Sequence, residues 1–154
     1  MVSSGEIHFA EATPGEKEWA AGIMAGSDPW LTLGITIEQC RTNCFDPEFS
    51  LYIAHVNRQP CGMILIDPKG IAGSPYIKSI AVQHDFRGRG VGQALIGFAE
   101  SLFQNKSRHL FMCVSSFNTR ARSLYERLGF RKVGEFEDYI VNGKSEILLC
   151  KRLR

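Results

Sequence analysis

Three glycines gather in one short stretch, Arg87-Gly88-Arg89-Gly90-Val91-Gly92, immediately before a segment with helical periodicity. Because glycine has no Cβ, the backbone of such a stretch can adopt positive φ and approach a ligand closely. The first amides of a helix lack intrahelical partners and lie at the positive end of the helix dipole. The stretch is therefore suited to hold a phosphate or diphosphate, with Arg87 and Arg89 adding positive charge.

Two common phosphate-binding patterns do not fit this stretch. No Gly-Lys-Ser/Thr follows, as a P-loop requires. The G-x-G-x-x-G spacing of dinucleotide-binding folds is not met either, because Gly88 and Gly90 are followed by Gly92 and then Gly97. A glycine-rich turn that only introduces a helix stays open as the alternative at this point.

A second pair of polar residues lies further along the chain. Asn118 and Tyr125 are seven residues apart, so on a helix they share a face to within about 20°. Leu124 and Leu128 form the adjacent apolar stripe, which places Tyr125 at its edge with the hydroxyl free to reach a cleft. The alternatives are that Tyr125 is an amphipathic residue at the margin of the core and that Asn118 only caps the helix.

The elements that position these residues can be predicted from the hydrophobic pattern. Apolar residues recur with helical spacing over 90–104, which predicts a helix. The run 110–114 is continuously apolar, as in a strand buried on both faces. Together with a strand over 76–82, these segments form a βαβ unit with parallel strands and a right-handed crossover.

The remaining segments complete a mixed α/β fold. Further strands are predicted over 7–12, 49–56, 61–66, 131–138 and 145–151, and further helices over 16–25, from about 36 to 44, and over 119–128. We expect a mixed, mostly antiparallel central sheet with one parallel βαβ splay. Because the 154 residues contain no linker or repeat, we predict a single domain over 1–154.

Composition excludes several other classes of protein. The chain carries 18 basic and 16 acidic residues, a bias too weak to indicate a nucleic-acid partner. Residues 1–10 lack the apolar core of a signal peptide, and no apolar run is long enough to span a bilayer. The five cysteines include no CxxC pair, so we predict no metal site and a reduced, cytoplasmic protein.

The glycine-rich stretch resembles a known family motif. Arg87-x-x-Gly90-x-Gly92, preceded by Ile80-Ala81-Val82, is similar to the R/Q-x-x-G-x-G/A loop of the GNAT superfamily of N-acetyltransferases. The run from Asn118 through Tyr125 to Gly129-Phe130 resembles the second hallmark of that family. The two hallmarks span residues 80–130, and the order of elements extends the likeness over nearly the whole chain.

The resemblance implies acetyl-CoA as cosubstrate, with pantetheine between two splayed strands and paired with a strand edge by β-augmentation. One backbone N–H there would stabilise the oxyanion. Tyr125 would protonate the departing thiolate. The residues expected to bind the cofactor are Ile80, Ala81, Val82, Arg87, Gly88, Arg89, Gly90, Val91, Gly92, Gln93 and Asn118.

The residue that would deprotonate the acceptor amine is not identified by the motifs. Ribosomal-protein N-terminal acetyltransferases of the superfamily place a glutamate where this chain has Cys113, which we interpret as a core residue. Many relatives use a carboxylate on the strand that carries Ile80, but residues 76–79 offer none. The other candidates are an ordered water and the side chains of His84, Glu38, Asp46 and Glu48.

The acceptor is expected to be a primary amine of a small molecule or of a protein. Trp30, Phe45 and Tyr139 are the residues that could wall its site. A catalytically silent acyl-CoA-binding or sensor module is the alternative, because both usual carboxylates are missing. A homodimer is compatible with the sequence.

Overall fold

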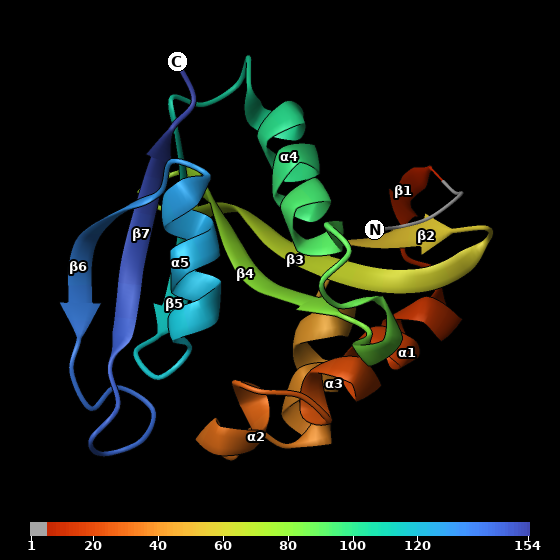
Figure 1. Cartoon of the computed structure of the whole chain (residues 1–154), viewed down its shortest axis with the longest axis horizontal. Coiled ribbons are helices and arrows are strands. Elements are labelled where there is room, and N and C mark those ends of the chain that lie inside the picture. The colour runs from red at the N-terminus through yellow and green to blue at the C-terminus, as the bar shows by residue number, and fades with distance from the viewer. Residues whose placement is uncertain (1–5) are drawn as a thin grey trace.

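A seven-stranded sheet organises residues 6–154, the part of the chain that this computed structural model describes (Figure 1). The strands are β1 (Ile7–Glu11), β2 (Ser50–Val56), β3 (Gln59–Ile71), β4 (Ser74–Val82), β5 (His109–Ser115), β6 (Arg131–Phe136) and β7 (Glu146–Arg152). Their order across the sheet is β1-β2-β3-β4-β5-β7-β6. The pairing of β4 with β5 is parallel and every other pairing is antiparallel, which confirms the predicted fold class.

Helices cover both faces of the β1–β4 half of the sheet. They are α1 (Pro14–Ala25), α2 (Trp30–Leu33), α3 (Ile37–Phe45) and α4 (Val91–Phe103), with a 3₁₀ turn at His84–Phe86. The helix α5 (Thr119–Arg127) packs instead against β5 in the other half. The helices α1 to α3 lie on one side of the β1–β4 half, and α4 lies on the other (Figure 1). None of the helices within residues 6–154 is long and apolar enough to cross a bilayer.

The alternation of side chains along β3 explains these layers. Met63 and Leu65 are fully buried in the cluster beneath α1 and α3, whereas Ile64 and Ile66 are fully buried in the cluster beneath α4. Successive side chains of a strand point to opposite faces, so a continuously apolar run places one layer of core on each side.

Capping residues set the start of the two longer N-terminal helices. Thr13 precedes α1, and its hydroxyl accepts from the Glu16 amide at 3.2 Å while Glu16 accepts from the Thr13 amide. Thr36 and Gln39 form the same reciprocal box at α3, so this helix starts where the sequence predicts. Each box satisfies two amides that a helix N-terminus leaves unpaired.

The structure differs from the predicted elements in two places, and both differences have local reasons. The strand predicted over 61–66 continues through residues 67–71 as part of β3, and the chain turns at Ala72 and Gly73 with φ of +49° and +83°. Pro68 is tolerated because β2 pairs with β3 only as far as Ile66, which leaves the following residues at an edge. The sequence prediction also missed α2, whose four residues are too few to show periodicity.

We predicted that residues 1–10 do not form a signal peptide. Of these, residues 1–5 lie outside the part of the chain that the structure describes.

Candidate active site

The strands β4 and β5 separate soon after they meet. Their ladder contains only the pairs Tyr76 with Phe111 and Ile77 with Met112. On the other edge of β4, Leu65 pairs with Ser79 and Ile66 with Ile77, so Lys78 is an extra residue in a β-bulge. Because a bulge bends its strand, β4 turns away from β5, and residues 78–82 lack a strand partner on that edge within residues 6–154.

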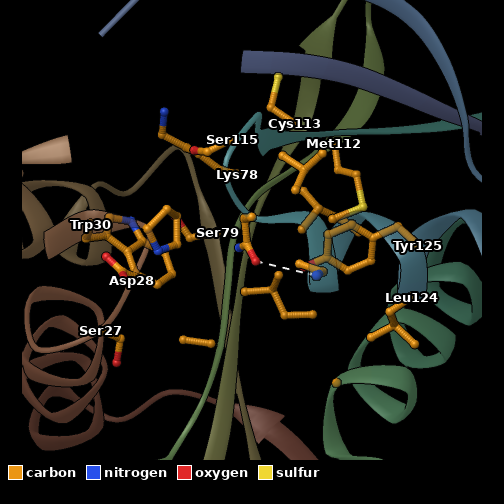
Figure 2. A pocket seen from close by; sticks show the side chains of 18 of the residues that line it. Ser27, Asp28, Trp30, Lys78, Ser79, Met112, Cys113, Ser115, Leu124 and Tyr125 are labelled. Carbon is orange, nitrogen blue, oxygen red and sulfur yellow. Dashed lines mark hydrogen bonds between the residues drawn. The ribbon is translucent and has the colours of Figure 1, made fainter. Parts of the chain in front are cut away.

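A cavity of about 1300 Å³ runs through this gap. Figure 2 shows Ser27, Asp28 and Trp30 on one side of it, Leu124 and Tyr125 on the other, and Ser79 between them. We divide the cavity into two parts. The loop side is lined by residues within the segments 80–82, 87–93 and 118–125. The carboxylate side is lined by residues 27–30, Tyr76, Cys113, Ser115, Tyr139 and Glu146. All residues predicted to bind the cofactor line the cavity except Arg89, and Tyr125 lines it as well.

The backbone of the glycine-rich stretch forms one wall of the loop side. Gly88 and Gly90 have φ of +75° and +85°, and a Cβ built at either residue would meet nothing within 4 Å. Gly90 is the N-cap of α4 and makes no side-chain capping bond. The amides that open α4 therefore keep their donors free for a ligand, which is the arrangement that binds anions at helix N-termini.

Both arginine side chains of this stretch are held by the protein itself. The Arg87 guanidinium donates to the Val82 carbonyl and to the Ser27 hydroxyl, each at 3.2 Å. The Arg89 guanidinium lies 5.8 Å from the centre of the Phe86 ring. Arg87 thus connects the loop to the end of β4 and to the segment that follows α1, and the free donors at the N-terminus of α4 are backbone amides.

The helix α5 presents Asn118 and Tyr125 to the same cavity, as their spacing predicts. Asn118 is the N-cap, and its Oδ1 accepts from the Ala121 amide at 3.4 Å. Beyond the C-terminus, Gly129 adopts φ of +102° and the Phe130 amide donates to the Tyr125 carbonyl, which confirms the predicted left-handed ending.

The Tyr125 side chain is buried at 8% exposure, edge-on to the Phe130 ring. Burial raises the pKa of Tyr125 to about 12, because the phenolate would be poorly solvated. The phenol therefore stays protonated at neutral pH. Within residues 6–154 its hydroxyl makes no hydrogen bond, and it is free to donate to a ligand.

The carboxylate side contains an acid that the motifs did not reveal. Glu146 opens β7, directly opposite Ser115 at the end of β5, and the Ser115 hydroxyl donates to Glu146 Oε2 at 2.6 Å. Burial raises the pKa of the Glu146 carboxyl, and the hydrogen bond from Ser115 opposes this only in part. No local pattern marks Glu146, because its place depends on the pairing of β5 with β7.

Cys113 lines the cavity and does not lie in the core, contrary to its interpretation from sequence. Figure 2 shows Met112 against Tyr125 and Cys113 pointing away from it. Cys113 lies beside Tyr76 on β4, and burial raises the pKa of both groups. A thiol of this kind stays protonated, which does not suit a nucleophile.

The other proposed bases lie away from the cavity. Glu38 pairs with Arg41, and neither Glu38 nor Asp46, Glu48 or His84 belongs to the residues that line the cavity in the described part of the chain. Of the three aromatic residues proposed for the acceptor, Trp30 and Tyr139 line the cavity and Phe45 does not. No cluster of His, Cys, Asp or Glu among residues 6–154 is arranged to hold a metal ion.

Comparison with known proteins identifies the same family that the sequence motifs resemble. The model of the acetyltransferase (GNAT) family matches residues 16–130. An uncharacterised N-acetyltransferase of Methanocaldococcus jannaschii is 30% identical over 112 residues, which cover 71% of this chain and 67% of that protein.

Solved structures share the fold. The ribosomal-protein-S18-alanine N-acetyltransferase of Escherichia coli superposes with a TM-score of 0.78 at 17% identity, over 96% of this chain and 94% of that one. A Bacillus anthracis protein assigned as a streptothricin acetyltransferase, in complex with acetyl coenzyme A, superposes with a TM-score of 0.62 at 24% identity. The superposition covers 70% of this chain and 64% of that one.

Proposed function

The chain belongs to the acetyltransferase (GNAT) family of acetyl-CoA-dependent N-acetyltransferases, and we propose that it transfers the acetyl group to a primary amine by direct attack. The observation that carries this proposal is the gap between β4 and β5, which joins the uncapped N-terminus of α4 to the part of the cavity that contains the Glu146 carboxylate. Two substrates that enter from the two sides would meet in that gap.

The loop side fits acetyl-CoA in both shape and polarity. Gly88 and Gly90 open the backbone toward the cavity, and the free amides at the start of α4 suit the diphosphate. The unpaired edge of β4 at Ile80, Ala81 and Val82 suits the amides of pantetheine, as an added strand would. A cavity of about 1300 Å³ exceeds the usual size of a drug-like pocket, as a long coenzyme requires.

The chemistry would use groups that line the gap. Acetyl-CoA supplies an activated thioester, so the protein must orient it, polarise its carbonyl and protonate its sulfur. A backbone N–H of residues 80–82 would stabilise the oxygen that becomes negative, and donors of this kind contribute about 3 kcal/mol. Tyr125, kept protonated by its burial, would donate its proton to the sulfur as the C–S bond breaks.

An assay of coenzyme A release tests this function. The protein is incubated with acetyl-CoA and a panel of primary amines, including lysine-type and α-amines, and the free thiol is measured with a thiol reagent. We expect saturable, amine-dependent release. A rise in melting temperature with acetyl-CoA but no release with any amine would favour the silent binding module instead.

A further inference from the structure

Among residues 6–154, three carboxylates line the cavity, and they differ in their hydrogen-bond donors. Asp28 Oδ1 accepts from both the amide and the hydroxyl of Thr32, and these bonds lower the pKa of Asp28. Asp67 Oδ1 accepts from the Lys69 amide. Glu146 receives one hydrogen bond, from Ser115 to Oε2, and its Oε1 has no partner within residues 6–154.

The register of the sheet fixes where the Glu146 carboxylate lies. Glu146 is paired with Ser115, and Leu148 with Cys113, so these side chains share one face of the sheet. Met112 and Val114 belong to the opposite face and to the core that contains Tyr125. Because β5 borders the gap, Glu146 and Tyr125 approach it from opposite faces, so one can reach the attacking nitrogen and the other the departing sulfur.

The surroundings of Glu146 suit a positively charged ligand. No Lys or Arg in the described residues forms an ion pair with this carboxylate, and the nearby cation Lys78 lies over the Phe49 ring. Tyr76, Tyr139 and Trp30 line the same side of the cavity. Aromatic rings and an unpaired carboxylate together favour an ammonium group.

From these contacts we propose that Glu146 binds the ammonium group of the acceptor and removes its proton, so that the acceptor is a basic, cationic primary amine. This inference rests on the proposed acetyl transfer. A lysine-type amine is only about 0.1% neutral at pH 7.4, so it needs a base before it can attack. Ser115 acts as a positioning residue, because it holds Oε2 and leaves Oε1 to face the cavity.

Every proton in the proposed acetyl transfer has a donor and an acceptor. Glu146 takes one proton from the ammonium group, and the nitrogen lone pair then forms the C–N bond. The C–S bond breaks with its electron pair on sulfur, which receives the Tyr125 proton. The second proton lost by nitrogen restores Tyr125, and Glu146 returns its proton to solvent, which gives one proton released per turnover.

The test compares Glu146→Gln with wild type on the best acceptor of the amine panel, from pH 6.5 to 9.5. Glutamine keeps the shape and can still accept from Ser115, but it cannot take a proton. We expect kcat/KM at pH 7 to fall about 100-fold and the deficit to shrink toward high pH, where a larger fraction of the amine is neutral in solution. The titratable and charged groups around Glu146 are Tyr76 and Lys78 from β4, Cys113 from β5 and Tyr139 before β7. Burial raises the pKa of Tyr76 and of Cys113, so both stay uncharged at pH 7, and the Lys78 ammonium lies over the Phe49 ring.

Two further variants complete the test. Glu135→Gln, on the adjacent β6 and outside the cavity lining, should keep kcat/KM within about twofold. Ser115→Ala should lose about 5- to 10-fold, with its pH profile displaced from that of wild type. Two results would overturn the role of Glu146 but leave the proposed acetyl transfer intact. In both, Glu146→Gln binds acetyl-CoA normally, and it either keeps its activity at pH 7 or loses activity equally at every pH. A wild-type protein that releases no coenzyme A with any amine would overturn the proposed function as well.

Discussion

The loop side and the carboxylate side meet at one gap but are built in different ways. The loop side comes from two short stretches of chain, 80–93 and 118–125, and it offers mainly backbone amides. The carboxylate side gathers side chains from the segment before α2, from β4, β5 and β7, and from the segment between β6 and β7. Backbone recognition leaves a sequence motif, whereas a site assembled from distant side chains leaves none.

The two sides also differ in the charge that they attract. Free amides and a helix N-terminus favour an anion, while the Glu146 carboxylate, whose Oε1 has no partner within residues 6–154, favours a cation. Because the gap between β4 and β5 separates them, a substitution on one side should change the binding of one substrate and not of the other. The variants described next test whether the two substrates bind independently of each other.

The strongest effect on acetyl-CoA binding should come from Gly90→Val. A β-branched side chain is strained at φ of +85°, and it would project into the open cavity beside the helix mouth. We expect acetyl-CoA affinity to fall at least 100-fold by titration calorimetry. Gly73→Val is the matched control, because Gly73 has φ of +83° but lies in the β3–β4 turn outside the cavity lining. Equal losses of affinity in both variants would show that strain, and not the helix mouth, causes the effect.

Tyr125→Phe should separate chemistry from binding. Loss of the phenolic proton should lower kcat on the order of 10²- to 10⁴-fold and leave acetyl-CoA affinity within about twofold. Steady-state kinetics and calorimetry on the same preparation measure both. Tyr52→Phe, a half-buried tyrosine packed against Phe98, should behave as wild type. An unchanged kcat in Tyr125→Phe would remove Tyr125 from the mechanism.

Tyr139→Ala probes the carboxylate side alone. Tyr139 is 69% exposed and packs against Phe136, so its removal should cost little stability. Loss of one aromatic contact to the acceptor should raise KM for the amine about 3- to 10-fold, with no change in the affinity for acetyl-CoA. If acetyl-CoA affinity fell and KM for the amine stayed constant, the assignment of the two sides would be reversed.

Glu146→Gln should slightly raise the stability of the protein, although it lowers activity. Burial raises the pKa of Glu146 in the folded protein above that of a free glutamate, so the charged form costs stability at pH values above the folded pKa. The variant should melt about 1–2 °C higher at pH 7, and the difference should vanish as the pH falls below 4.5. A melting temperature lowered at pH 7 would indicate that the carboxylate stabilises the fold.

Sequence prediction succeeded where local pattern decides structure. The mixed sheet, the glycine loop and the helix that carries Asn118 and Tyr125 follow from periodicity, caps and glycine spacing. Glu146 could not be predicted, because it reaches the site through the register of β7 against β5. Cys113 was misplaced for the same reason: an apolar run does not show which face of β5 borders a cavity.

A crystal structure of the protein with coenzyme A tests the central claim most directly. We predict that the diphosphate lies on the amides of residues 88–92 and that pantetheine follows the free edge of β4 at residues 80–82. The sulfur should then lie in the gap, within hydrogen-bonding distance of the Tyr125 hydroxyl. Coenzyme A bound elsewhere, with the mouth of α4 empty or filled by the side chains of the protein, would contradict the account.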